Sequence, residues 1–259
     1  MEYSRPKSLI HCRFFQNDGS PVIIFTHGMF LDSRTFEIQM EYFKHQYSVL
    51  VWDLPGHGKS IKLKTDDLFQ IAADGLLELM GDRWIEKAVL VGQSLGGLIG
   101  QYFAYHYPHR VTALVSIGGN ALDQMFEWKK GIAFSLYALL IRLFPIKLFG
   151  KIFAKGNAIH PHTRDYLVNN FTRMTKTQML TIVKGFSNGI RMGIPEAPRQ
   201  PHLITHGDRE PSFVIHMIKK WHEGSSNSEY VLIPDAGHIA NQDNPEEFNQ
   251  VVMDFIKDL

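Results

Sequence analysis

At 259 residues the chain is long enough for one large α/β domain or two small ones. Apolar residues make up 44% of it, which is enough for a substantial core, and 27 basic against 26 acidic residues leave a net charge of +1. That balance argues against nucleic acid or a strongly acidic molecule as the partner, since either one favours a markedly basic protein.

The cysteine count and the apolar tracts suggest a compartment. Cys12 is the only cysteine, so no internal disulfide can form, and a reducing, cytoplasmic location is expected. The N-terminus has no apolar signal segment, and the longest apolar tract, 131–143, is too short to cross a bilayer. We therefore expect no stable membrane span. The sequence indicates no oligomeric state.

Strand and helix patterns alternate along most of the chain. An edge strand is expected at 8–16, and buried strands, which are continuous apolar runs, at 22–26, 47–52, 89–91, 111–117, 201–205 and 229–233. Helical spacing follows most of them, at 32–45, 66–80, 95–107, 212–221 and 245–257. Asp32 or Ser33 is expected to cap the first of these helices. The alternation predicts a doubly wound, mostly parallel sheet with helices on both faces.

The alternation breaks between residues 121 and 198, where the pattern is helical and rich in Phe, Leu, Ile and Met. We interpret 1–120 with 199–259 as a core domain and 121–198 as a helical cap inserted after the strand that ends near Ile117. Phe126, Phe134 and Tyr137 are expected to line an apolar acyl pocket under this cap. Lysines are interleaved with its apolar residues. Such a pattern also suits a membrane surface, but a lid with solvated lysines is more common and is our expectation.

Residues 92–97 (Gly-Gln-Ser-Leu-Gly-Gly) follow a strand pattern and open a helix pattern. This order fits a nucleophile elbow, in which a sharp strand-to-helix turn lifts the Ser94 hydroxyl clear of the sheet. Glycines two positions before and after Ser94 remove side chains that would clash there. The backbone N–H of Leu95, at the helix N-terminus, would stabilise a developing oxyanion.

A serine hydroxyl needs a base to take its proton. The best candidate is His238, in a loop just past the last strand, and the acid expected to orient it is Asp208, at the end of the preceding strand. Two other carboxylates compete with Asp208. Asp123 lies shortly after an earlier strand, and Asp235 lies three residues before His238.

Five motifs, spread over nearly the whole chain, together resemble the α/β-hydrolases of the esterase, lactonase and C–C hydrolase group. They are His-Gly-Met at 27–29, Asp-Leu-Pro-Gly-His-Gly-Lys-Ser at 53–60, Gly-Gln-Ser-Leu-Gly-Gly at 92–97, His-Gly-Asp-Arg-Glu-Pro at 206–211 and Gly-His at 237–238. The resemblance implies an α/β-hydrolase fold and a triad of Ser94, Asp208 and His238. It also implies that the N–H of Met29 is the second oxyanion donor.

The chain departs from the family's pattern in two places. Only about twenty residues precede the first buried strand, so one edge strand of the family is expected to be absent. The acidic turn usually reads Asp-x-Asp-Pro, and Glu210 stands here in place of the second acid. We expect neither departure to affect the triad.

Several other strand-end and loop residues receive a role. Phe30 and Asn120 are expected to touch substrate. His27 and His57 are interpreted as structural, with His27 holding the oxyanion loop through hydrogen bonds, and Asp53 as serving its glycine-rich loop. His160 and His162 lack the company of cysteines or an acidic cluster, so we expect no metal site.

These residues together predict a serine hydrolase. The expected substrate is a small-molecule carboxylic ester, lactone or thioester with an apolar acyl part, cleaved through an acyl-enzyme on Ser94 without cofactor or metal. Two alternatives stay open: a C–C bond hydrolase or lyase with the same triad, and a non-catalytic receptor that binds a small molecule in the same pocket.

Overall fold

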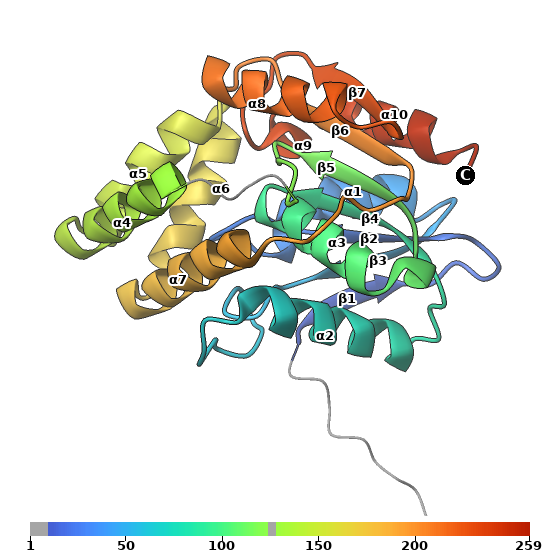
Figure 1. The fold of residues 1–259 in the computed structure, drawn as a ribbon, viewed down its shortest axis with the longest axis horizontal. Helices are drawn as coiled ribbons and strands as arrows, with labels where there is room; N and C mark the ends of the chain where they lie inside the picture. The colour runs from blue at the N-terminus through green and yellow to red at the C-terminus, as the bar shows by residue number, and fades with distance from the viewer. Residues whose placement is uncertain (1–9, 124–127) are drawn as a thin grey trace, which may run out of the picture.

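The fold, a computed structural model, is built on one seven-stranded sheet with the strand order β1-β3-β2-β4-β5-β6-β7 (Figure 1). It describes residues 10–123 and 128–259, with the backbone alone for 128–133. The strands are β1 (Cys12–Phe15), β2 (Val22–Thr26), β3 (Ser48–Trp52), β4 (Ala88–Gln93), β5 (Val111–Ile117), β6 (His202–Gly207) and β7 (Ser228–Ile233). All neighbouring strands run parallel except β1, which pairs antiparallel with β3 at the edge.

Helices cover both faces of the sheet and the end where the parallel strands finish. They are η1 (Ser33–Phe36), α1 (Glu37–Phe43), α2 (Leu68–Asp82), α3 (Leu95–His106), η2 (Pro108–Arg110), α4 (Trp128–Leu143), α5 (Ile146–Asn157), α6 (Pro161–Thr172), α7 (Lys176–Met192), α8 (Ser212–Glu223), α9 (Ala240–Asp243) and α10 (Pro245–Ile256). None of the helices in the described part of the chain combines the length and apolarity that a bilayer crossing needs.

Alternating strand residues explain the two-faced core. Ile24 and Leu90 pack with α2 and α3, while their neighbours Phe25 and Val91 pack with α1 and α10 on the other face. Because both faces are buried, the central strands are apolar at nearly every position, as parallel sheets require. The predicted doubly wound, mostly parallel sheet is confirmed.

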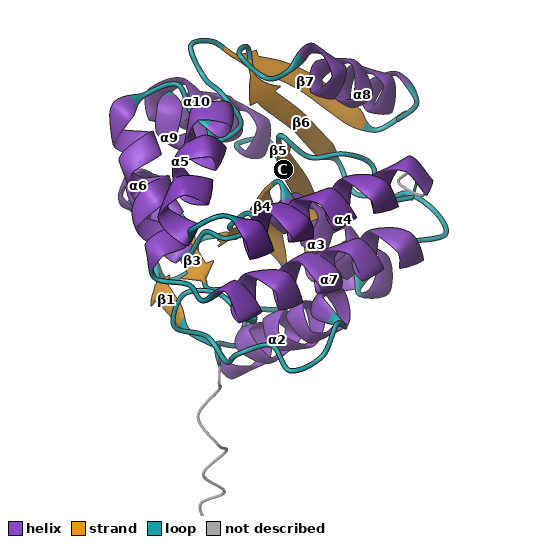
Figure 2. Ribbon diagram, turned by 90° about the vertical axis from the view of Figure 1, so that its left-hand side faces the viewer, coloured by secondary structure: helices purple, strands orange, loops and turns teal. Residues whose placement is uncertain are grey.

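The four helices between β5 and β6, α4 to α7, form the cap (Figure 2). Phe30, which lies just after β2, is fully buried against three aromatic rings of the cap: those of Tyr137, Phe153 and Phe171. Each buried ring pair adds dispersion and quadrupole attraction to the area it removes from water. The cap is therefore packed onto the end of the sheet through an aromatic cluster.

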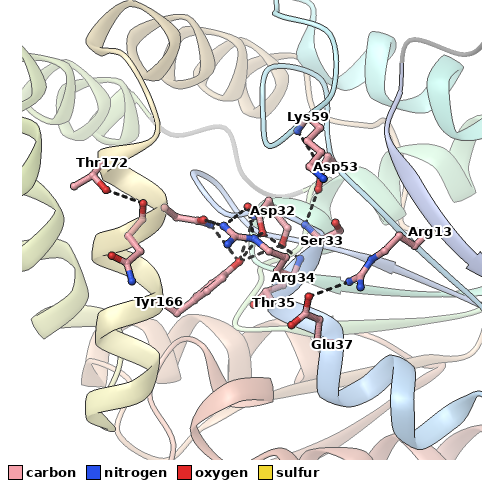
Figure 3. Close-up of polar contacts among 12 residues, drawn as sticks. Arg13, Asp32, Ser33, Arg34, Thr35, Glu37, Asp53, Lys59, Tyr166 and Thr172 are labelled. Carbon is pink, nitrogen blue, oxygen red and sulfur yellow. Dashed lines mark hydrogen bonds and ion pairs between the residues drawn. The ribbon is translucent and has the colours of Figure 1, made fainter.

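A polar network joins the same loop to α6 (Figure 3). The Arg34 guanidinium donates to the Asp32 carboxylate and to Asn170, and the Tyr166 hydroxyl donates to Asp32 Oδ1 at 3.1 Å. Burial alone would raise the pKa of Asp32, but the hydrogen bonds and the positive charge of Arg34 outweigh it, and the pKa is lowered. We call these four residues, Asp32, Arg34, Tyr166 and Asn170, the cap latch.

Local differences from the expected elements have simple causes. Asp32 caps the helix after β2 as expected, accepting from Arg34 N, but the first turn is a 3-10 helix and α1 begins only at Glu37. The four-residue helix α9 has too few residues to show a period of 3.6 and was not expected.

The packing of α7 on α2 predicts a specific loss of stability. A Cβ at Gly189 would lie 2.0 Å from the Phe69 ring, so we expect Gly189→Ala to cost about 1–3 kcal/mol of unfolding free energy by overpacking. Urea denaturation measures this. The matched control is Gly81→Ala on α2, where a Cβ meets nothing within 4 Å. That variant should be unchanged or gain up to about 1 kcal/mol. Equal stability of the two variants would contradict the packing argument.

Candidate active site

Ser94 lies at a strained turn between β4 and α3. Its backbone has φ 52° and ψ −112°, in the half of conformational space that non-glycine residues rarely adopt. The strain is held by hydrogen bonds on both sides of the residue, from Ser94 N to Ile117 O and from Gly97 N to Ser94 O. Strain of this kind persists only where the surroundings impose it, and it clusters at functional sites.

Two glycines allow the elbow to form. A Cβ at Gly92 would lie 2.3 Å from the backbone of Gly96 and Gly97, and a Cβ at Gly96 would lie 2.0 Å from the carbonyl oxygen of Thr26 on the neighbouring strand. Backbone cannot give way as a flexible side chain can. The expected close approach of strand and helix is thus present, and only glycine fits it.

His238 is oriented by Glu210. Its Nδ1 lies 2.6 Å from Glu210 Oε1, and the glutamate side chain is only 2% exposed. Gly118 closes the pair from the other side: it has φ +59°, and a Cβ there would lie 2.9 Å from His238 Nδ1 and 3.0 Å from Glu210 Oε1. The main-chain oxygen of His238 also accepts from Gln93, the residue before Ser94.

The expectation that Asp208 is the orienting acid is wrong in this geometry. The Asp208 carboxylate accepts from Ala236 N at 3.1 Å and thereby supports the loop that carries His238. A hydrogen bond from Glu210 N to Gly207 O closes a turn that separates the two acids. Glu210, whose side chain is one methylene longer than that of Asp208, points from this turn toward the imidazole. The Glu that stands at the second acidic position of this turn is therefore the carboxylate that contacts His238.

The rival carboxylates are not partners of His238 either. Asp235 lies 3.3 Å from His160 Nε2, and Asp123 Oδ1 is buried with no hydrogen-bond partner among the described residues. Neither carboxylate takes part in the hydrogen bond between His238 and Glu210.

The charge on Glu210 changes the acidity of His238. Burial alone lowers the pKa of the imidazole, because a low-dielectric surrounding disfavours the charged form. The nearby carboxylate and its hydrogen bond together outweigh burial, so the pKa of His238 is raised above its ordinary 6.5. With Nδ1 donating to Glu210, Nε2 of the neutral ring carries the free lone pair and can accept a proton.

The loop after β2 presents the second expected oxyanion donor. His27 fixes this loop as expected: its Nε2 accepts from Leu54 N at 2.9 Å, so its Nδ1 carries the proton and donates to Gly28 O at 2.8 Å. Burial lowers the pKa of His27, which suits a neutral ring in this role. Two N–H groups, those of Met29 and Leu95, were expected to hold the oxyanion. In the described part of the chain, neither donates to a main-chain oxygen in the hydrogen bonds of turns, loops and helix caps.

Ser94 and His238 line one small cavity of about 70 Å³. Its walls are otherwise mostly apolar: Met29, Leu31, Gln93, Phe153, Asn157 and Ile239. No hydrogen bond between Ser94 and His238 occurs among the described residues, and such bonds are often long in enzymes without substrate. A second cavity, of about 420 Å³, shares Leu31 with the first and is lined by charged groups that include Asp32, Arg34 and Asp53.

The residues expected to bind substrate lie elsewhere. Phe134 packs on Phe186 and Tyr137 on Phe149, both inside the cap, and neither lines the Ser94 cavity. Phe30 lines the larger cavity, and Asn120 accepts from Gln101 through its main-chain oxygen. Phe126 lies outside the described residues.

Four residues that line the Ser94 cavity, Leu31, Phe153, Asn157 and Ile239, received no individual role from the sequence, and they come from three segments. Leu31 and Ile239 directly follow residues with an expected role, so adjacency to Phe30 and His238 could have suggested them. Phe153 and Asn157 lie one turn apart on α5, and only the placement of the cap brings them to Ser94. No local pattern distinguishes them from other cap residues.

The other polar candidates have structural partners. The Asp53 carboxylate accepts from Ser33 N at 2.7 Å and Lys59 N at 2.8 Å, so it serves its loop as expected (Figure 3). His162 Nε2 donates to Gln242 O at 3.0 Å. In the described ranges, no group of three or more His, Cys, Asp or Glu side chains is arranged to hold a metal ion.

Comparison with known proteins identifies the family. The sequence profile of the alpha/beta hydrolase fold matches residues 21–245, which include the elbow and the loop of His238. The chain belongs to this family, as the five motifs implied.

Individual relatives are more distant. The chain is 25% identical to 3-oxoadipate enol-lactonase 1 of Acinetobacter baylyi over 93% of this chain and 91% of that protein. It is 26% identical to the pimeloyl-[acyl-carrier protein] methyl ester esterase of Wigglesworthia glossinidia brevipalpis, over 92% and 95%. The esterase EaEST of Exiguobacterium antarcticum superposes with a TM-score of 0.82 at 18% identity, covering 96% of this chain and 95% of that one, and shows the shared fold.

The pairing of His238 with Glu210 predicts how its protonation responds to substitution. Glu210→Gln removes the charge that raises the pKa but keeps the burial that lowers it, so the pKa of His238 should fall below its value in the parent protein. Histidine NMR titration measures this shift. Asp208→Asn is the matched control and should leave the pKa of His238 unchanged. If Asp208→Asn lowered it and Glu210→Gln did not, Asp208 would be the acid.

Proposed function

We propose that the protein is a serine hydrolase that cleaves a carboxylic ester, lactone or thioester through an acyl-enzyme on Ser94. The observation that carries the proposal is the strained Ser94 elbow, which shares a cavity with a histidine bound to a buried glutamate. The names of two relatives, a lactonase and a methyl ester esterase, are consistent with this bond class. A nucleophilic serine requires a nearby base that accepts its proton and a third group that orients this base.

In the proposed reaction, His238 Nε2 takes the Ser94 proton as Oγ attacks the substrate carbonyl. The N–H groups of Met29 and Leu95 stabilise the oxyanion, and Glu210 stabilises the imidazolium that forms. His238 then protonates the leaving alcohol or thiol, and the acyl group stays on Ser94. Water, deprotonated by His238, releases the acid and restores the hydroxyl.

The shape of the cavity favours a short or slim apolar acyl group. At about 70 Å³ it is far smaller than the few hundred Å³ typical of ligand pockets. Leu31, Phe153 and Ile239 offer it no hydrogen-bonding side chain. A longer acyl chain therefore requires the Phe153 side chain to move, and with it part of α5.

Replacement of the nucleophile tests the proposal. Ser94→Ala should lower kcat/KM on p-nitrophenyl butyrate by at least about 10³-fold, since only the oxyanion hole and binding remain. A fluorophosphonate probe should label Ser94 in the parent and nothing in the variant, as mass spectrometry can show. The control Ser226→Ala, on an exposed loop, should match the parent. Equal turnover by Ser94→Ala and the parent would refute the proposed function.

The acyl-chain limit is a separate expectation. Phe153→Ala should raise the ratio of kcat/KM on p-nitrophenyl octanoate to that on the acetate by about tenfold, because removing the ring enlarges the cavity beside Ser94. The comparison is Phe213→Ala, whose exposed ring on α8 is remote from that cavity and should leave the ratio unchanged. A ratio unchanged in Phe153→Ala would show that the ring does not limit the acyl group.

A further inference from the structure

The segment made of α4, α5 and the turn between them has many exposed apolar side chains. Among the described residues fifteen large apolar side chains are exposed, and six of them lie within this one helical hairpin. They are Leu136, Leu139, Leu143, Phe144, Leu148 and Ile152, between 37% and 67% exposed. The spacing of three to four residues within each helix places them along one stripe per helix. We call these six residues the hairpin face; the helices α4 and α5 lie at the left-hand end of the molecule in Figure 1.

This face is not a by-product of core packing. The opposite side of α5 already supplies Phe149, Gly150 and Ala154 to the interior, and α4 supplies Ile141. Leu148 and Ile152 are therefore additional to the side chains that attach the hairpin to the protein. Clusters of exposed apolar residues of this size mark interaction sites more often than single exposed leucines do.

The charged residues of the segment that carries the hairpin face are all basic. Lys147, Lys151 and Lys155 form a stripe on α5 next to the apolar one, and Arg142 lies between Leu139 and Leu143. From residue 128 to residue 164 the sequence contains no Asp or Glu. None of the four cations has an ion-pair partner among the described residues. The surface is therefore complementary to an apolar phase with a negatively charged boundary.

We propose that the hairpin face docks the protein onto an anionic lipid membrane. Aliphatic and Phe side chains would enter the headgroup boundary, while the lysine stems extend along it and keep their ammonium groups among the lipid phosphates. Lysine is depleted from the cores of protein interfaces, which use Tyr, Trp and Arg instead, so this composition favours lipid over a protein partner. The helices lie on the surface and do not span it.

A second copy of the chain is a poorer occupant of this surface. In a two-fold symmetric dimer the same patch faces itself. Lys147, Lys151, Lys155 and Arg142 of each copy would then lie opposite like charges with no acidic residue of the hairpin to pair with. A bilayer with anionic lipids removes the apolar surface from water and neutralises the cations together.

Vesicle co-sedimentation of the full chain tests the proposal. The protein should bind phosphatidylcholine vesicles that contain phosphatidylglycerol, bind pure phosphatidylcholine vesicles much less, and lose binding as salt is added. Near an anionic surface each lysine is worth about fivefold in partitioning, so Lys147→Glu with Lys151→Glu should weaken binding by at least about 25-fold. Leu143→Glu with Leu148→Glu should abolish it.

Matched controls on α8 separate this surface from net charge and general stickiness. Lys219→Glu with Lys220→Glu changes the net charge equally, and Phe213→Glu alters an equally exposed apolar residue; both should bind like the parent. Ser94→Ala should also bind like the parent, so loss of the proposed activity and loss of docking are distinguishable. Thermal unfolding checks that each variant folds.

Two results would overturn the proposal. The first is no binding of the parent to anionic vesicles; dimer formation through the hairpin face, measured by sedimentation velocity with the same variants, would then identify a second copy as the occupant. The second is an equal effect of the α8 lysine pair and the α5 lysine pair.

Discussion

The hydrogen bond between His238 and Glu210 is the contact on which the arrangement of the site depends. A buried carboxylate is costly unless a hydrogen-bond donor compensates its charge. The imidazole of His238 provides this donor, with Nδ1 2.6 Å from Glu210 Oε1. The positive φ of Gly118 makes room for the pair, Gln93 ties the His238 main chain to the elbow, and Asp208 supports the loop from below. Residues at the ends of three strands, β4, β5 and β6, therefore converge on this one hydrogen bond, and the position of His238 relative to Ser94 follows from them.

Much of this fold could be predicted from the sequence because the strands and helices of a doubly wound sheet have distinct hydrophobic patterns. Buried parallel strands such as Val111–Ile117 are apolar on both faces, so they are recognisable without knowing their neighbours. The elbow could also be predicted, because its requirement for glycine lies within six residues of sequence. At Gly92 and Gly96 a Cβ would clash with backbone atoms of neighbouring segments. The predicted strand ends then indicate which loops contain functional residues, because ligands bind at the carboxyl ends of the strands in such sheets.

The acid and the pocket could not be predicted in the same way. Asp208 and Glu210 lie in the same turn, and the backbone conformation of that turn decides which of them faces His238. The spacing of apolar residues in the sequence contains no information on this conformation. Tyr137 and Phe153 are both aromatic residues on cap helices, yet one packs inside the cap and the other reaches the Ser94 cavity. Their difference arises from where the cap helices place them in the folded protein. The acid that contacts His238 and the walls of the Ser94 cavity are thus set by tertiary placement, whereas the Ser94 elbow is set by a local motif.

The cap latch has a consequence for how such a protein can acquire new substrates. Asp32 and Arg34 lie in the segment that runs from Met29 into η1, so Tyr166 and Asn170 on α6 are connected through them to the loop of Met29. Under the proposed mechanism, substitutions on α6 would shift Met29 N relative to Ser94 without altering either residue. In a laboratory selection for altered specificity, adaptive changes should accumulate at the latch as well as at the cavity wall, and the two sets should show epistasis.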